Sequence, residues 1–195
     1  MINNKSDYLY YLEEDRKAAD KLNKPKLLGD ELWKYTRLMR KYEYYVNCKK
    51  NRFICAILQW KYKKTSIKYG FSIPINTFGP GLRIIHRGTI VVNPGAKIGA
   101  NARVNCDVVI GAKLGTNKES PTIGKNCYFS PGCKIFGNIT VGDNVIIASN
   151  AVVTKNVESD VTVGGVPARV ISYKSTKEIQ ILCINKLLSG KENDI

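Results

Sequence analysis

Residues 122–153 read TIGKNC YFSPGC KIFGNI TVGDNV IIASNA VV, and this stretch decides the fold. The second letter of every hexad is aliphatic or aromatic, and the same spacing continues upstream. Ten residues form this aliphatic column: Val92, Ile98, Val104, Ile110, Ile123, Phe129, Ile135, Val141, Ile147 and Val153. A second column, four positions further on, is small or β-branched: Ala96, Ala102, Val108, Cys127, Cys133, Ile139, Val145 and Ala151. Because only 44% of the residues are hydrophobic, ten matches at fixed spacing are not a chance pattern.

The period of six matches neither the 3.6-residue repeat of an α-helix nor the two-residue alternation of an ordinary strand. It indicates a strand of about four residues followed by a bend of about two. Three such units close a triangular coil, so that residues about 18 apart stack at the strand-pairing distance of about 4.8 Å. Glycine and asparagine suit the strained backbone at the corners. We therefore predict a mainly β protein built as a parallel β-helix, with the aliphatic column filling its interior.

The aliphatic column is interrupted once. It passes from Ile110 to Ile123, which is one residue more than two hexads. The intervening residues 112–122 are polar, and we expect them to loop out from a corner of the coil. Loops on a rigid scaffold commonly carry function, so this loop is expected to border a functional site.

The sequence before the column is helical in character. Asp30 is expected to cap a helix whose apolar stripe is Leu32, Tyr35, Leu38, Met39, Tyr42 and Val46. A further amphipathic segment covers about residues 52–68, with Phe53, Ile54, Ile57, Leu58 and Trp60 among Lys49, Lys50, Lys61, Lys63 and Lys64. Such a stripe packs against another helix, the interpretation that we favour, or lies on a membrane surface.

The sequence after the column predicts a short C-terminal helix. Ser175 and Glu178 have the spacing of a capping box that opens a helix, and Gly190 is placed to end it. We therefore expect an α-helical N-terminal region (residues 1–70), a β-helix (71–171) and a C-terminal helix with a tail (172–195).

The composition is that of a soluble protein of one domain. The 195 residues contain no apolar run of the roughly 18 residues that a membrane span needs. The N-terminus is polar and acidic, unlike a signal or transit peptide, so we expect a cytoplasmic protein. The six cysteines form no C-x-x-C pair, and there is one histidine. Reduced thiols and no metal site are therefore expected.

The net charge of +15 is the unusual number. Residues 1–70 hold 17 basic and 8 acidic residues, so the excess is densest there. It fits an ordinary solvated surface, an anionic cofactor, an anionic lipid surface with peripheral membrane contact, or nucleic acid. No recognised nucleic-acid motif is present, so we expect no nucleic-acid partner.

Three motifs accompany the hexads: residues 79–82 (GPGL), residues 85–92 (IHRGTIVV) and residues 165–169 (GVPAR). Together they resemble the serine acetyltransferase family, most closely its short branch found in capsule and exopolysaccharide gene clusters. The resemblance covers nearly the whole chain. It implies a left-handed parallel β-helix, a homotrimer or a hexamer of two trimers, and an O-acetyltransferase that uses acetyl-CoA as its acyl donor and needs no metal.

His86 is the candidate catalytic base. It is the only histidine, and it lies six residues before Val92, where the column calls for an aliphatic residue. An alcohol is a poor nucleophile at neutral pH, and imidazole has a pKa suited to removing its proton. The resemblance implies that the histidine of this motif deprotonates the acceptor hydroxyl, which then attacks acetyl-CoA directly. Ser72, Asn105 or a backbone carbonyl is expected to orient the imidazole.

The resemblance also implies the remaining site residues. The pantetheine arm of acetyl-CoA is expected along Gly111, Ser130, Pro131 and Ala148, and its phosphates or adenine near Lys155 and Arg169. Asn105 and Asp107 are the candidate acceptor-binding residues.

This chain departs from the resembled family at three points. Ile85 stands where the family has an aspartate before the histidine, and Phe71 and Ser72 stand where it has a second aspartate. Glu119 and Ser120 replace the loop Arg-His pair that holds the carboxylate of serine. These departures favour a sugar hydroxyl of a capsular or exopolysaccharide precursor, whereas the overall similarity favours L-serine. A non-catalytic hexapeptide-repeat scaffold is the alternative function.

Overall fold

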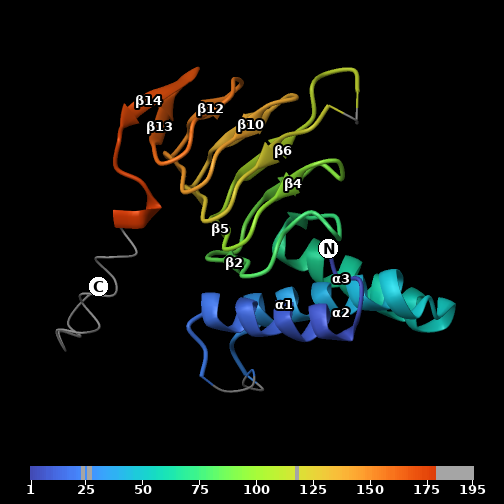
Figure 1. The fold of residues 1–195 in the computed structure, drawn as a ribbon. Helices are drawn as coiled ribbons and strands as arrows, with labels where there is room; N and C mark the ends of the chain where they lie inside the picture. Colours follow the sequence, from blue (N-terminus) through green and yellow to red (C-terminus); the bar gives the residue numbers. More distant parts are fainter. Residues whose placement is uncertain (23–24, 26–27, 117–118, 179–195) are drawn as a thin grey trace.

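A computed structural model describes residues 1–22, 25, 28–116 and 119–178. A layer of helices lies across one end of a three-sided prism of short strands (Figure 1). The helices are α1 (Lys5–Ala18), α2 (Glu31–Tyr44), a π-helical turn (Tyr45–Lys49) and α3 (Arg52–Tyr69). The strands are β1 (Phe71–Ser72), β2 (Arg83–Ile84), β3 (Ile90–Val92), β4 (Lys97–Ile98), β5 (Arg103–Val104), β6 (Val108–Gly111), β7 (Thr122–Ile123), β8 (Tyr128–Phe129), β9 (Lys134–Phe136), β10 (Thr140–Val141), β11 (Ile146–Ile147), β12 (Val152–Val153), β13 (Thr162–Gly165) and β14 (Ala168–Ser172).

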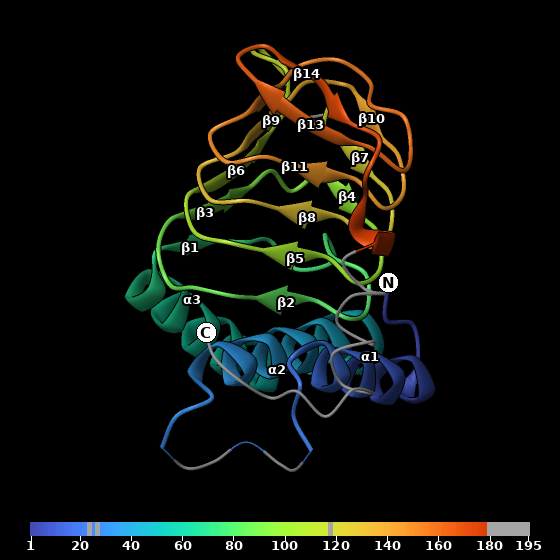
Figure 2. The ribbon, with the colours of Figure 1, turned by 90° about the vertical axis from the view of Figure 1, so that its left-hand side faces the viewer.

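The strands form three sheets, one on each side of the prism. Their orders are β1-β3-β6-β9-β12, β10-β7-β4 and β14-β13-β11-β8-β5-β2, and Figure 2 shows the last of these stacked above the helices. Except for β14, the paired strands are parallel. Ile123 lies beside Val141, 18 residues on, as the hexads predict.

The aliphatic column fills the interior. Its ten members are at most 4% exposed, and all the residues of the second column are buried as well. Across the loop the pairing offset becomes 25, as between Val104 and Phe129. Seven extra residues are thus looped out while the stack continues, which confirms the loop predicted at residues 112–122.

One row of corners is held by a ladder of side-chain amides. Asn101, Asn126 and Asn144 adopt left-handed backbone, with φ of 60°, 57° and 59°. Asn101 Nδ2 donates to Asn126 Oδ1 at 2.9 Å, and Asn126 Nδ2 donates to Asn144 Oδ1 at 2.8 Å. Asn144 Nδ2 continues the ladder to Asp160 Oδ1 at 2.7 Å. Asparagine serves here because it tolerates this backbone and also joins one coil to the next.

The last strand departs from the prediction of a wholly parallel coil. β14 reverses direction after Gly165 and pairs antiparallel with β13, with Gly164 beside Arg169. Since β14 ends that sheet, it covers the edge that β13 would otherwise leave open.

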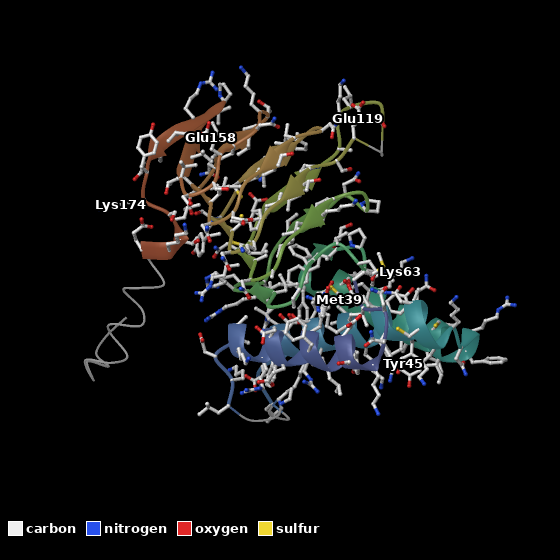
Figure 3. The ribbon with its side chains drawn as sticks, viewed as in Figure 1. Met39, Tyr45, Lys63, Glu119, Glu158 and Lys174 are labelled. Atoms are coloured by element: carbon white, nitrogen blue, oxygen red, sulfur yellow. The ribbon has the colours of Figure 1, made fainter. Side chains whose placement is uncertain are left out.

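The helix over Glu31–Tyr44 packs as its apolar stripe predicts. Tyr35 and Met39 are buried in the main core, and Leu32, Leu38 and Tyr42 pack against it. Met39 lies where α2 meets the prism (Figure 3). Asp30 takes the N-cap position, as predicted, but its side chain makes no capping hydrogen bond. Its backbone is left-handed instead of extended, and its carboxylate pairs with Lys21 Nζ at 2.6 Å.

Helix α3 has the predicted bounds but a different buried face. Leu58, Tyr62, Ser66 and Tyr69 are buried, whereas Phe53, Ile57 and Trp60 are exposed. The favoured interpretation, in which those apolar residues pack against another helix, is therefore wrong for these three. Tyr62 explains why: its hydroxyl donates to the Ile73 carbonyl at 2.8 Å, which turns the tyrosine face of α3 toward the prism.

A buried ion cluster joins the helices to the first coil. Arg40 donates to Asp15 at 2.8 Å, to Glu43 at 3.0 Å, and to the carbonyls of Phe78 and Gly79 at 3.0 and 2.6 Å. Asp15 in turn accepts from the backbone N–H groups of Gly81 and Leu82, both at 2.8 Å. Burial disfavours the charge of Arg40, but the two carboxylates outweigh it and raise its pKa. Helix side chains thus satisfy backbone groups at an end of the prism that has no further strand to pair with.

The C-terminal capping box is confirmed. The backbone N–H and the hydroxyl of Ser175 donate to Glu178 Oε2 at 2.7 and 2.9 Å. The predicted helix end at Gly190, and Cys183, lie outside the described residues. Within the described part of the chain, no helix is both long and apolar enough to cross a membrane.

Candidate functional site

His86 lies at a corner of the prism and not in the aliphatic column. Ile84 pairs with Val104 and Val92 pairs with Ile110, so eight residues fill a step that takes six in the next coil. Ile84 occupies the interior position and is buried. The expectation that His86 replaces an aliphatic residue of the column was therefore wrong, because it assumed a regular first coil. The two extra residues widen this corner, and the imidazole is exposed on it.

The neighbours of His86 hold the corner in place. Arg87 forms an ion pair with Glu31 of α2, and its guanidinium lies 5.8 Å from the centre of the Tyr69 ring. The Gly88 N–H donates to the Tyr69 carbonyl at 3.2 Å. A Cβ at Gly88 would lie 3.0 Å from the Cβ of Cys106, so the corner rests closely on the next coil.

The two side chains expected to orient His86 do not contact it through a hydrogen bond. Asn105 is buried, and its Nδ2 donates to the Phe129 carbonyl at 2.9 Å. Ser72 is exposed on β1, beside Val91 of β3. Among the described residues, the imidazole itself has no hydrogen-bond partner.

Small residues line the same edge of the prism above His86. The N–H groups of Ile85, Asn105, Ser130 and Ala148 donate in turn to Val104, Phe129, Ile147 and Val163 at 2.8 to 3.1 Å. These four residues therefore hold equivalent positions in four successive coils. The structure thus brings the predicted residues Asn105, Ser130 and Ala148, with Pro131 next to Ser130, onto the edge that His86 begins.

Asp107 lies at the following turn of the same edge. Its backbone is left-handed, with φ of 60°. Its carboxylate is 3.4 Å from Lys134 Nζ, and its carbonyl accepts from the same lysine at 2.7 Å. The Asp107 carboxylate is exposed.

The other predicted cofactor residues lie elsewhere. Gly111 ends β6 beside Phe136, and both residues precede a second corner of the prism, next to the loop. We call the row of corners on this side the second edge. Lys155 follows β12 on that second edge and is exposed. Arg169 lies on β14, exposed, with its guanidinium donating to the Ala168 carbonyl at 3.1 Å.

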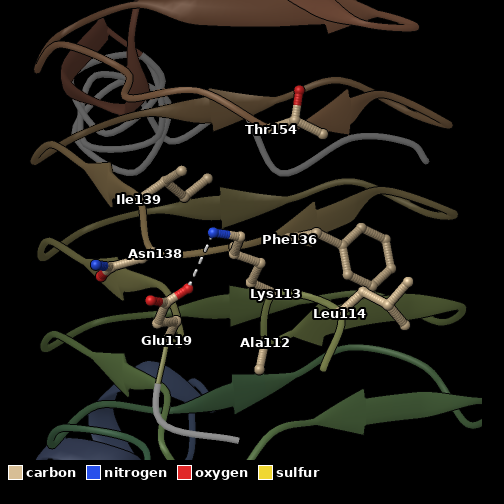
Figure 4. Close-up of a pocket in the computed structure, with 9 residues that line it drawn as sticks. Ala112, Lys113, Leu114, Glu119, Phe136, Asn138, Ile139 and Thr154 are labelled. Carbon is tan, nitrogen blue, oxygen red and sulfur yellow. Dashed lines mark ion pairs between the residues drawn. The ribbon is translucent and has the colours of Figure 1, made fainter. Parts of the chain in front are cut away.

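The loop and the second edge enclose a hollow of about 690 Å³ (Figure 4). It is lined by Ala112, Lys113, Leu114, Glu119, Phe136, Gly137, Asn138, Ile139 and Thr154. The loop is closed by the Lys113 N–H, which donates to the Glu119 carbonyl at 2.9 Å, and by an ion pair of 3.5 Å between their side chains. Phe136 and Thr154 were not predicted from the sequence, although the available signal was an aromatic residue directly after the aliphatic Ile135.

Within one chain, this hollow and His86 lie at different corners. The loop is joined to Asn93, whose Oδ1 accepts from Ser120 Oγ at 2.9 Å. Asn93 directly follows β3, whereas His86 precedes that strand. Strand β3 (Ile90–Val92) therefore separates the two corners. The expectation that the loop borders the site of His86 thus fails for a single chain.

The buried cysteines do not have the character of nucleophiles. Burial raises the pKa of the Cys127 thiol to about 11 and that of the Cys133 thiol to about 12. Both thiols are protonated at neutral pH and behave as small apolar groups. In the described residues, no group of three or more His, Cys, Asp or Glu side chains is placed to hold a metal ion.

Comparison with known proteins agrees with this geometry. Residues 120–155 match the family of bacterial transferase hexapeptide proteins (six repeats). The chain is 36% identical over 122 residues to the serine acetyltransferase of Buchnera aphidicola subsp. Acyrthosiphon pisum (strain APS), covering 60% of this chain and 44% of that protein. The chain is thus similar to serine acetyltransferases and contains a segment of bacterial transferase hexapeptide repeats.

Solved structures extend the likeness to the helical layer. The serine acetyltransferase of Brucella abortus strain S19 superposes with a TM-score of 0.73 at 26% identity, covering 88% of this chain and 71% of that one. The same enzyme in complex with coenzyme A gives 0.70 at 24% identity, with 88% and 70% covered. The chain spans less than half the length of the curated relatives that it matches.

Proposed function

We propose that the protein is an acetyl-CoA-dependent O-acetyltransferase with His86 as its general base. The observation that carries the proposal is the exposed imidazole at a widened corner, at the start of an edge lined by small residues. We also propose that the parallel coil winds left-handed, as the resemblance implies, and that residues 1–70, 71–171 and 172–195 are its three parts.

The reaction uses few groups. His86 takes the proton of the acceptor hydroxyl, and the hydroxyl oxygen attacks the thioester carbonyl of acetyl-CoA. The tetrahedral oxyanion collapses, the C–S bond breaks, and the CoA thiolate leaves and receives the proton from the imidazolium. Backbone N–H groups at the corner stabilise the oxyanion. No acyl-enzyme forms in this scheme.

Acetyl-CoA fits a surface with small side chains and separate cations. Ser130, Pro131 and Ala148 leave room for the pantetheine arm, and Gly111 does the same on the second edge. The positive charges of Lys155 and Arg169 suit phosphate oxygens. The coenzyme A complex of the Brucella enzyme supports this choice of donor.

We propose that the site is completed between the subunits of a homotrimer. His86 and the loop lie at two different corners of one prism, and a threefold axis brings one corner of each copy to the other corner of its neighbour. The loop of one subunit then borders the His86 edge of the next. A hexamer of two such trimers is compatible with the same site.

L-serine is the acceptor that the names of the relatives support. A neutral sugar hydroxyl is a second candidate, favoured by one specific observation. Glu119 stands where the resembled family has a cation for the serine carboxylate, and it is paired with Lys113. A carboxylate at that position repels an anionic acceptor and accepts hydrogen bonds from hydroxyl groups.

The test is thiol release from acetyl-CoA with serine, nucleotide sugars and oligosaccharides as acceptors. His86→Ala should lower the rate about 10²- to 10⁴-fold, as loss of a general base does. Cys106→Ser is the matched control, because Cys106 is the thiol packed against this corner. Direct transfer predicts that it keeps the rate and sequential kinetics. Wild-type turnover by His86→Ala, or loss of activity in Cys106→Ser with ping-pong kinetics, would overturn the proposed base.

Mixed assemblies test the shared site. His86→Ala and a variant lacking residues 113–119 should each be inactive, but trimers containing both have an interface with one intact histidine and one intact loop. Co-expression should therefore restore part of the activity. Restoration would not occur if each chain carried a complete site.

A further inference from the structure

The outward face of α3 is apolar although nothing in the described chain covers it. Phe53, Ile57, Trp60 and Ile67 are 85%, 55%, 61% and 72% exposed. At about 100° per residue, these four lie within an arc of about 80° along the whole helix. The arc is opposite the face of Leu58, Tyr62 and Tyr69 that is buried. We call these four residues the α3 stripe.

Lysines surround the α3 stripe. Lys61 and Lys68 flank it on one side and Lys63 on the other, all exposed. Lys64 lies within the arc, with its Nζ 5.2 Å from the centre of the Trp60 ring. Lys49, Lys50 and Arg52 precede its first residue. The long side chains can thus keep their charges beside an apolar surface that the stripe enters.

The charge of this region is of one sign. Residues 44–106 contain 11 basic residues and no aspartate or glutamate. Residues 1–43 contain eight acidic residues. Seven of them form ion pairs with cations of the same chain: Glu13, Glu14, Asp15, Asp20, Asp30, Glu31 and Glu43. A partner for the α3 stripe must therefore bring its own negative charge.

We propose that α3 binds the surface of an anionic phospholipid bilayer, lying parallel to it with the α3 stripe at the level of the headgroups. Tryptophan and phenylalanine suit that depth, and lysines beside an apolar stripe are typical of helices that lie in the interface. Because no described helix can span the bilayer, the contact is peripheral.

Two other partners fit less well. A second copy that presented its own α3 stripe would bring two sets of lysines together with no acid to pair them, which costs energy. Nucleic acid would satisfy the lysines, but it offers no apolar phase for Ile57 and Ile67.

The proposal gives the molecule an orientation. Lys63 lies in the helical layer, at the end of the molecule opposite Glu158 (Figure 3). His86 follows β2, the strand nearest that layer in its sheet (Figure 2). The bilayer would therefore lie at the end of the prism that carries the candidate base.

Vesicle co-sedimentation of the full chain tests the proposal. Wild type should bind vesicles of phosphatidylglycerol mixed with phosphatidylcholine at physiological salt, and not vesicles of phosphatidylcholine alone. The triple variant Phe53→Ser, Ile57→Ser, Trp60→Ser should lose this binding. Val170→Ser, Ile171→Ser, Tyr173→Ser is the matched control, since these three are also exposed apolar residues but lie at the other end of the prism. It should bind as wild type does.

A second pair of variants tests the charge. Lys61→Gln, Lys63→Gln, Lys64→Gln should weaken binding on the order of a hundredfold, because each lysine near an anionic surface contributes about a factor of five. Lys97→Gln, Lys125→Gln, Lys174→Gln removes the same charge from exposed positions on the prism and after β14 and should have a much smaller effect.

Tryptophan emission gives an independent readout. Trp33 is buried and Trp60 belongs to the α3 stripe, and the chain has no other tryptophan. In Trp33→Phe, adding phosphatidylglycerol vesicles should shift the emission to the blue as Trp60 leaves water. Failure of wild type to bind these vesicles would overturn the proposal. So would an α3 stripe variant that binds normally, one that changes the oligomeric state, or mixed-sequence RNA binding that depends on the lysines and not on the stripe.

Discussion

The prism and the helical layer are held together in opposite ways. In the prism, each coil repeats the contacts of its neighbours, so that the aliphatic column and the amide ladder distribute stability over many equivalent positions. In the layer, contacts occur once each: the pair of Arg40 and Asp15 links α2, α1 and the first coil. Repetition makes a structure tolerant of single changes and easy to predict, whereas a unique buried link makes it sensitive to one residue.

The largest effect is expected where the link is unique. Arg40→Met should destabilise the protein by about 3–5 kcal/mol, because Asp15 and Glu43 remain buried without their cation. Urea unfolding followed by circular dichroism should show helical signal lost before the β signal. Arg37→Met, one turn earlier on α2 and partly exposed over the Trp33 ring, is the control and should change stability little. A single unshifted transition in Arg40→Met would show that the cluster does not hold the layer.

A matched pair of isoleucines compares the two regions directly. Ile135→Ala in the prism interior should cost about 2–5 kcal/mol, since it leaves a cavity among buried side chains. Ile57→Ala on the exposed face of α3 should cost less than about 0.5 kcal/mol. Thermal or urea unfolding measures both. Equal effects would mean that the α3 stripe is covered in the protein in solution.

The amide ladder should respond less, and in two steps. Asn126→Ala should cost about 2 kcal/mol for two reasons. It removes two hydrogen bonds, and alanine tolerates the left-handed backbone of this corner less well than asparagine does. Asn126→Gly removes the same bonds but relaxes the backbone, so about half that loss is expected. If the two variants were equally stable, the backbone would contribute nothing at this corner.

The smallest effect is expected at the C-terminal capping box, whose Glu178 is exposed. Hydrogen bonds from Ser175, first from its backbone N–H, lower the pKa of Glu178 below its ordinary 4.5. The cap therefore contributes fully above pH 4.5 and is lost as the pH falls through the lowered pKa. In wild type, the protection of the Ser175 amide from hydrogen exchange, relative to its intrinsic rate, should fall over that acidic range. Glu178→Gln should exchange faster at neutral pH and show little dependence on pH there.

The sequence alone was enough to predict the prism and parts of the helical layer. The hexads predicted the triangular coil, the buried columns, the asparagine corners and the looped-out segment. Helix α3 (Arg52–Tyr69) and the capping box at Ser175 were also predicted from local signals. Helix α1 was not predicted as an element, although Asn4 caps it by accepting from the Asp7 N–H, which is a readable signal.

For the candidate site, the sequence predicted which residues take part, and the fold determined where each of them lies. His86, Asn105, Ser130 and Ala148 were chosen from spacing and resemblance, and the register places them along one edge. The same register moves His86 out of the column and puts Gly111 and the loop at another corner. A count of residues could not show this, because the first coil takes eight residues where a regular one takes six.

What the sequence determined by itself is what repeats or lies within one turn. A six-residue period specifies its own neighbours, since each coil packs on a copy of itself. What only the tertiary structure decided depends on residues far apart in the chain. Asp15 accepts hydrogen bonds from the backbone of Gly81 and Leu82, which joins α1 to the first coil. Tyr62 donates to the Ile73 carbonyl, which turns the tyrosine face of α3 inward and leaves the Trp60 face open. Both faces of α3 are apolar enough to pack, so the sequence could not decide between them, and the hydrogen bonds to the first coil did.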